Sequence, residues 1–324
     1  MATNEAPSTL TPSILKSSVC PLDCPDTCSL SVTIAENRVT AVRGSNANPY
    51  TDGVICNKVT RSYPEFVHGK GRLTQPLKRV GPRGSGRFEP VSWDEALDLV
   101  HTGLSKAIAQ HMDRRFFHKL GATLLDRGPL CGAVRGTAYL SLYGPCPGMP
   151  PEQAREADLI VVWGNNITVS NLHMAKVIKE ARAQGAKLVI IDPKRTRIAE
   201  QADLFLQITP GSDVVLAQAL AAELERRGAL DQDFISRWVS GFEPYMTEAR
   251  KYDADSVAEL CALSKEQFHS FAEHYATAQR VAVSLGNGIE RGHSGGSSLR
   301  AAMALQALTG NHGRRGAGVI AKPG

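Results

Sequence analysis

The sequence predicts an α/β protein in which a small β-rich domain precedes a larger Rossmann-like region built on a parallel sheet. Apolar residues alternate between residues 29 and 43, as in a β-hairpin. Two short, continuous apolar runs at 158–163 and 187–191 flank a helical pattern at 171–184, which is typical of a βαβ unit. A further apolar run at 281–285 adds another buried strand.

Composition sets limits on the class of protein. The chain has 324 residues, of which 42% are hydrophobic, enough for two globular domains with cores. No stretch approaches the about 18 to 20 apolar residues that a membrane span needs. The formal net charge of +5 is spread along the chain without a basic block, so we expect no nucleic-acid partner. The first 19 residues carry neither an apolar signal region nor a twin-arginine pair, and we expect them to form a disordered leader of a cytoplasmic protein.

Four cysteines surround the predicted hairpin in a three-plus-one arrangement. Three lie close together and the fourth follows after the hairpin, so the set is Cys20, Cys24, Cys28 and Cys56. A tight loop with three thiolates and a distant fourth can hold the four irons of a cubane 4Fe-4S cluster. Structural zinc is the rival interpretation, although zinc sites usually bring two symmetrical ligand pairs. Free core cysteines are the third alternative.

The hairpin is followed by a helix with a clear start signal. Ser92 is placed to cap it, and Glu95 three residues later completes a capping-box pattern. Leu97, Val100 and Leu104 recur at helical spacing, so this face is expected to pack in a core. A second helix is expected to begin directly afterwards, near residues 112–116.

The βαβ unit carries polar residues where its strands end. Gly164 and Asn165 follow the first strand, and Asp192 with Pro193 follows the second. An acidic residue at the tip of the second strand is where Rossmann-like folds bind a ribose or base. The Gly-x-Gly-x-x-Gly fingerprint is absent, which argues against ordinary NAD binding.

The later part of the chain is expected to be mostly helical from 213 to 280. After the strand at 281–285, a loop opens at Gly286, and a glycine-containing loop at 291–298 leads into a helix with Arg300. Before the βαβ unit, Cys131 lies beside Gly132, and such small neighbours would let a thiol approach a metal closely. A buried free cysteine is the alternative for Cys131, and Cys146 is a second ligand candidate.

Taken together, several segments resemble the amino-terminal signature of the molybdopterin oxidoreductases of the dimethyl-sulfoxide-reductase superfamily. They are the cysteine run at 20–28, the return at 56–58, and the stretches at 72–81 and 91–97. The similarity extends over nearly the whole chain. It implies a leader at 1–19, a 4Fe-4S domain at 20–80, and a dinucleotide-binding α/β region at 81–324 that ends before the family's full length.

The resemblance also implies residue roles. In the family a lysine at the position of Lys58 lies between cluster and pterin, and the molybdenum or tungsten ligand falls near Cys131. The loop and helix that contain His293 and Arg300 would face this metal, although a surface histidine and a salt-bridged arginine are the alternatives.

Further family positions match the guanine half of a molybdopterin guanine dinucleotide site. Gly164 and Asn165 would approach phosphates, Asp192 and Pro193 would meet the nucleotide, and Gly211, Ser212 and Asp213 would close the pocket. Gly286 is a further candidate for cofactor binding. Each also has a simpler explanation as a turn glycine, a strand stop or a helix cap.

The expected function is therefore a molybdenum or tungsten oxidoreductase. Electrons would pass between a small substrate and a carrier protein or subunit, with the 4Fe-4S cluster as intermediary. The alternative is a non-catalytic iron-sulfur electron-transfer or assembly module of the same fold. Gly132 follows the candidate ligand where formate dehydrogenases have a proton-handling histidine, so an anionic or oxo substrate is favoured over formate. Compared with the family, about one strand and its loop are missing near residue 111.

Overall fold

The structure is a computed structural model that describes residues 13–22, 24, 26–111 and 131–320. The described chain divides into two compact units. One contains residues 13–15, 32–42 and 57–111, and the other contains 16–31, 43–56 and 131–320. The second unit therefore joins the cysteine-bearing segments to the α/β region, whereas the sequence suggested a division near residue 80. The helix expected near 112–116 lies outside the described residues.

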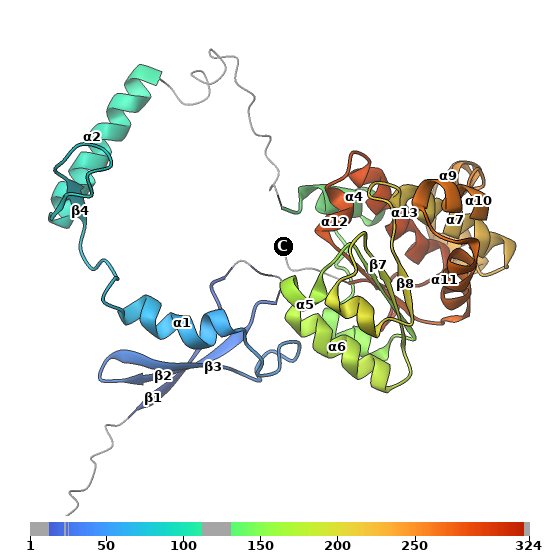
Figure 1. Ribbon diagram of the computed structural model, residues 1–324, viewed down its shortest axis with the longest axis horizontal. Helices are drawn as coiled ribbons and strands as arrows, with labels where there is room; N and C mark the ends of the chain where they lie inside the picture. The colour runs from blue at the N-terminus through green and yellow to red at the C-terminus, as the bar shows by residue number, and fades with distance from the viewer. Residues whose placement is uncertain (1–12, 23, 25, 112–130, 321–324) are drawn as a thin grey trace, which may run out of the picture. The chain divides into compact units, whose positions relative to one another are not determined.

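Three short strands form the sheet of the amino-terminal region. Strands β1 (Ile14–Val19), β2 (Ser29–Ala35) and β3 (Arg38–Gly44) occur in that order, and β2 and β3 form the predicted hairpin (Figure 1). The turn residues Glu36 and Asn37 have φ values of 49° and 59°, the left-handed conformation that a tight hairpin turn requires at both positions. Strand β1 corrects the expected leader, because pairing with β2 orders Ile14–Val19 although they lack a signal of their own.

The next elements are α1 (Asn57–His68), the hairpin strands β4 (Leu77–Arg79) and β5 (Phe88–Pro90), and α2 (Trp93–His111). Helix α2 begins as predicted, with Ser92 Oγ accepting the Glu95 backbone N–H at 3.1 Å. Its apolar face differs from expectation, because Leu97, Val100 and Leu104 are 55–60% exposed. Periodicity identifies which face is apolar, but it does not determine whether another element covers that face.

A five-stranded parallel sheet organises the second unit. Its order is β10 (Gly318–Val319), β9 (Val281–Leu285), β6 (Leu159–Trp163), β7 (Lys187–Ile191) and β8 (Leu204–Leu206). Every residue of β6 and β9 is buried, which explains why these strands are continuous apolar runs. The predicted α/β class and parallel sheet are confirmed.

Helices cover both faces of this sheet. On one face, Ile160 and Val162 pack with Met174, Val177 and Ile178 of α6 (Leu172–Ala183). On the other, Leu159, Val161 and Trp163 join a core to which α7 (Asp213–Arg226), α11 (Lys265–Thr277) and α13 (Gly295–Leu308) contribute (Figure 1). The remaining helices are α4 (Ala133–Tyr143), α5 (Ile167–Ser170), α8 (Gln232–Trp238), α9 (Phe242–Ala249), α10 (Ala254–Cys261) and α12 (Asn287–Glu290), with 3-10 turns at Pro151–Glu156 and Arg197–Gln201.

The strand order defines where a ligand would bind. From β6 the chain proceeds outward through β7 to β8, and it then returns to β9 on the other side of β6. The connections that follow these two neighbouring strands, β6 and β9, therefore lead toward opposite edges of the sheet. In open α/β sheets this topological switch point is the usual ligand site.

Candidate functional site

The cysteine-bearing segments are held together by backbone hydrogen bonds. The loop that contains the first three cysteines closes when Cys20 N–H donates to the Cys28 carbonyl at 2.9 Å. Ser45 N–H donates to the Ser29 carbonyl at 2.9 Å, which ties the segment that leads to Cys56 beside this loop. All four predicted cluster cysteines thus belong to one compact unit.

The four thiols influence one another electrostatically. Cys28 is buried, Cys20 and Cys56 are half-buried, and Cys24 is exposed. Burial, together with the negative charges of Asp26 and of the other three cysteines, raises the pKa of Cys28 to about 12. A thiolate crowded in this way needs a strong positive partner, which cluster irons supply when they bind deprotonated cysteines. The donor set therefore fits a 4Fe-4S cluster.

Among the described residues, no group of three or more His, Cys, Asp or Glu side chains is arranged to hold a single metal ion. A cubane cluster does not require such a group, because each of its four cysteines binds a separate iron.

A buried polar network lies directly beside the cysteine loop. His173 of α6 pairs with Asp26, with 2.8 Å between Nδ1 and Oδ2, and its Nε2 is 2.8 Å from the Val54 carbonyl. The Tyr50 hydroxyl is 3.3 Å from Asp26 Oδ1 and donates to Asn171 Oδ1 at 2.7 Å. Burial lowers the pKa of His173, but the hydrogen bonds to Asp26 and Val54 outweigh burial and raise the pKa overall. Sequence reasoning missed this network, because no periodic pattern links residues so far apart.

The switch point is formed by close backbone contacts between glycines. Gly286 N–H donates to the Trp163 carbonyl at 2.8 Å, and Gly288 N–H donates to the Gly164 carbonyl at 3.0 Å. A Cβ at position 286 would lie 1.9 Å from the Gly164 oxygen, so only glycine fits there. Asn165, expected near phosphates, is buried and donates through Nδ2 to Ser284 Oγ at 3.0 Å.

Two carboxylates lie at the same edge of the sheet. Asp192 follows β7 and accepts the Lys194 backbone N–H at 2.9 Å, and Asp213 begins α7 and accepts from Trp163 Nε1 at 2.7 Å. Burial raises the pKa of both groups, and the Asp192 charge adds to the rise at Asp213. Each is thus a poorly solvated acceptor that a hydrogen-bond donor on a ligand would stabilise.

A hollow of about 510 Å³ reaches Pro193, the residue that follows Asp192. Its lining residues are Pro193, Gln207, Ile208, Thr209, Pro210, Ala262, Leu263 and Gln267. The adjoining loop contains Gly211, at φ 89°, whose carbonyl accepts from Ser294 Oγ at 3.2 Å. Ser212 directs its hydroxyl to the Thr209 carbonyl at 2.7 Å. The predicted nucleotide residues therefore gather at the carboxyl edge of the sheet.

Cys131 is exposed, and its thiol lies against the loop that follows β9. Asn287 Nδ2 donates to Cys131 Sγ at 3.2 Å, and Arg291 donates to the Cys131 carbonyl at 3.2 Å. Arg135 in turn donates to Asn287 Oδ1 at 2.9 Å, and its backbone N–H donates to the buried Glu290 at 3.0 Å. Sequence reasoning missed Asn287, although its place between two glycines after a buried strand was a usable signal.

The other predicted site residues are exposed. Lys58 is the second residue of α1, His293 lies before α13, and Arg300 lies on α13. Cys146, the second ligand candidate, is also exposed, and its thiol is 3.5 Å from the neighbouring Pro147 carbonyl.

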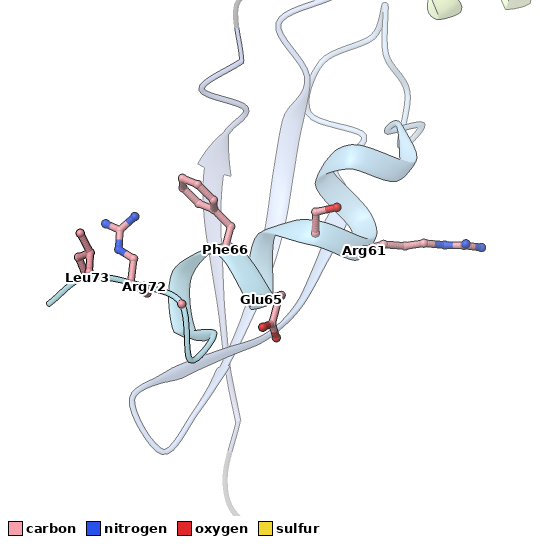
Figure 2. Close-up of a pocket in the computed structure, with 7 residues that line it drawn as sticks. Arg61, Glu65, Phe66, Arg72 and Leu73 are labelled. Atoms are coloured by element: carbon pink, nitrogen blue, oxygen red, sulfur yellow. The ribbon is translucent and has the colours of Figure 1, made fainter. Parts of the chain in front are cut away.

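A second hollow, of about 750 Å³, lies along α1 in the other unit, and the sequence did not anticipate it. Its lining residues are Arg61, Ser62, Glu65, Phe66, Gly71, Arg72 and Leu73. The Arg72 guanidinium lies 5.4 Å from the Phe66 ring centre, whereas Arg61 is directed away from both (Figure 2).

Comparison with known families gives two matches. A family model described as the molybdopterin oxidoreductase Fe4S4 domain matches residues 15–68. Another, described as molybdopterin oxidoreductase, matches residues 72–126 and 146–322. Together they include the cysteine segments and the parallel sheet.

Similar proteins are found in several organisms. The chain is 32% identical over 324 residues to the probable oxidoreductase YoaE of Bacillus subtilis, covering 94% of this chain and 47% of that protein. It is 28% identical to the F420-dependent formate dehydrogenase subunit alpha of Methanocaldococcus jannaschii, and the match covers 93% of this chain and 46% of that protein. The chain spans about half the length of the curated relatives it matches.

Among solved structures, acetylene hydratase from Pelobacter acetylenicus superposes with a TM-score of 0.74 at 25% identity. The superposition covers 91% of this chain and 43% of that one. Within the part of the chain that the structure describes, no helix combines the length and apolarity needed to cross a bilayer.

Proposed function

Because the chain belongs to the molybdopterin oxidoreductase family, we propose that it exchanges electrons between a small substrate and an external carrier. Its redox groups would be a 4Fe-4S cluster and a molybdenum or tungsten ion held by molybdopterin guanine dinucleotide. The observation that carries the proposal is the gathering of four cysteines in the same compact unit as a parallel sheet with a glycine-lined switch point.

The cysteines would hold the cluster. Cys28 supplies the buried ligand, and Cys24 supplies the exposed one. An exposed edge of this kind suits exchange of electrons with a carrier protein, because the redox group need not be uncovered by a conformational change. Lys58, two residues after Cys56, would add a fixed positive charge on the pterin side.

The carboxyl edge of the sheet would hold the dinucleotide. Asp192 and Asp213 are acceptors with raised pKa values, and guanine presents N–H donors that such groups can bind. The glycines at 164 and 286 let the backbones that follow β6 and β9 approach each other closely, and the dinucleotide would bind beside this contact. The hollow bounded by Pro193 and Gln207 gives the nucleotide a place beside Asp192.

Cys131 would be the protein ligand of the metal ion. When bound, the molybdenum or tungsten ion supplies two-electron redox chemistry at the substrate. The Asn287 amide donates to the Cys131 sulfur and would orient the thiolate, while Arg135 fixes the amide from its other side. His293 and Arg300 are proposed to face the same centre.

The substrate is proposed to be an anion or an oxygen-atom acceptor. The Arg300 guanidinium could bind an oxyanion through two parallel hydrogen bonds. Formate is disfavoured because Gly132 cannot accept the proton that formate oxidation releases. The Methanocaldococcus relative is a formate dehydrogenase subunit, so the two proteins would differ in substrate class.

Metal analysis of anaerobically purified protein tests the proposal. We expect about four irons per chain for a 4Fe-4S cluster, together with molybdenum or tungsten. Cys56→Ser should lower the iron content and bleach the broad visible absorption, whereas Cys146→Ser, which changes an exposed cysteine outside the set, should leave both unchanged. Zinc in place of iron would refute the cluster site.

The non-catalytic alternative is separated by the same measurement. Iron without molybdenum or tungsten, in protein produced where the pterin cofactor is made, would identify an electron-transfer or assembly module. Cys131→Ala should abolish activity while the iron content stays constant. Full activity in this variant would assign the ligand role elsewhere.

A further inference from the structure

His173 connects both cysteine-bearing segments to the α/β core. Through Nδ1 it binds Asp26, which lies between Cys24 and Cys28, and through Nε2 it binds the carbonyl of Val54, two residues before Cys56. We propose that His173 is a positioning residue for the cluster, which holds the two segments in register and sets the cluster's reduction potential through its contact with Cys28. The inference rests on the proposed cluster site.

The ring of His173 is fixed by its surroundings. The residue is 2% exposed, and Met174 and Val177, its neighbours on α6, are completely buried in the core of the sheet. A histidine anchored to the sheet in this way transmits the position of α6 to the cysteine loop, because its two nitrogens belong to one rigid ring and contact two different segments.

A second contact supports the Cys20–Cys28 loop, and it comes from the segment that leads to Cys56. Tyr50 approaches Asp26 on one side and donates to Asn171 of the α5–α6 junction on the other. Its ring centre is 5.7 Å from that of His173. Tyr50 thus braces Asp26, whereas His173 is placed to act on Asp26, Val54 and Cys28 together.

The electrostatic effect follows from which atoms face the sulfur. A carbonyl oxygen only accepts, so Nε2 of His173 donates its N–H to Val54. Nε2 also lies 3.9 Å from Cys28 Sγ, so a polar N–H group lies beside this cluster ligand. Hydrogen bonds and charges near the sulfurs set cluster potentials, and a positive pole favours the more negative, reduced cluster. Removing His173 should therefore lower the reduction potential.

Potentiometric titration of the full chain, followed by electron paramagnetic resonance, tests this inference. We expect His173→Phe to lower the equilibrium constant for cluster reduction about tenfold, which is about 59 mV for a one-electron couple. His173→Gln keeps an amide donor and should shift the potential in the same direction by a smaller amount. Both variants should lose iron to a chelator faster than the wild type.

Tyr50→Phe is the matched control. It removes one hydroxyl that contacts Asp26 and leaves His173 and its neighbours in place. It should therefore hasten iron loss while the equilibrium constant for cluster reduction stays within about twofold of the wild-type value. An equal shift in Tyr50→Phe and His173→Phe would overturn the proposal, because general loosening of the loop would then explain both.

An unchanged potential in His173→Gln would also overturn it, and this variant carries the test if His173→Phe does not fold or does not hold iron. Failure of the cluster assignment itself would look different. In that case the wild-type protein would contain no iron-sulfur cluster, whatever the variants do.

Discussion

Gly286→Ala tests the glycine contact at the topological switch point. A methyl group at this position would lie 1.9 Å from the Gly164 oxygen, 2.4 Å from its carbonyl carbon and 2.6 Å from Asn165 Cα. All three are backbone atoms, so no side chain can rotate to make room. Carbon atoms pack at about 3.5 Å, and the β6 and β9 loops would have to separate by about 1 Å.

The size of the effect follows from what that separation breaks. The bonds from Gly286 N–H to the Trp163 carbonyl and from Gly288 N–H to the Gly164 carbonyl would be lost, since 2.8 Å and 3.0 Å would stretch beyond hydrogen-bonding range. Two such bonds contribute about 1–3 kcal/mol, and overpacking adds about 1–3 kcal/mol. We expect Gly286→Ala to lower the free energy of unfolding by about 2–6 kcal/mol.

Urea unfolding, followed by tryptophan fluorescence and far-UV circular dichroism, measures this change. Gly136→Ala is the matched control, because Gly136 lies inside α4 with open space around its added methyl group. Alanine there should raise the free energy of unfolding by about 0.5–1 kcal/mol. Equal stability of Gly286→Ala and the wild type would refute the close-contact argument.

Three further outcomes are expected. Asp192→Ala should weaken retention of the guanine dinucleotide without changing iron content, and equal loss of both would mark Asp192 as a folding residue. Asp213→Asn should keep the hydrogen bond from Trp163 and remove a buried charge. Burial raises the pKa of Asp213, so the native state binds the proton more tightly than the unfolded state does. The contribution of Asp213 to the free energy of unfolding therefore falls as the pH rises from about 3.9 through the folded pKa. The stability gained by Asp213→Asn should therefore grow with pH across that window, and a constant difference in urea unfolding would contradict the sign. Finally, the intact enzyme should not oxidise formate at ordinary rates of about 1 to 1000 per second, and such turnover would disprove the argument from Gly132.

Much of the second unit was predictable because its strands are buried on both faces. The apolar runs at 158–163, 187–191 and 281–285 correspond to β6, β7 and β9, and no other short element produces such runs between glycine-rich turns. The hairpin was equally clear, since its alternation and its turn agree. Strand β1 could not be recognised, because an edge strand with exposed side chains depends on hydrogen bonds to its neighbour.

The site was predictable only where local chemistry identifies it. Cysteine spacing indicated a common site for the four thiols. No local sequence signal, however, identifies His173, 147 residues later in the chain, as the partner of Asp26. The contact of Asn287 with Cys131 likewise depends on how α12 meets the start of α4. The apolar stripe of α2 was read correctly as a pattern, yet its exposure depends on packing that spacing does not encode.

The dependence of the cysteine segments on α6 has a consequence for biosynthesis. All four cysteines leave the ribosome before His173, and 117 residues separate Cys56 from it. At translation rates of about 5–20 residues per second, roughly 6–25 s pass between the two. During that interval the thiols exist without the brace that fixes their spacing, and they are open to oxidation or to capture of zinc. Iron delivery in the cell is thus best timed after the first βαβ unit has been made, and slowing synthesis between these residues should increase the fraction of protein that carries the wrong metal.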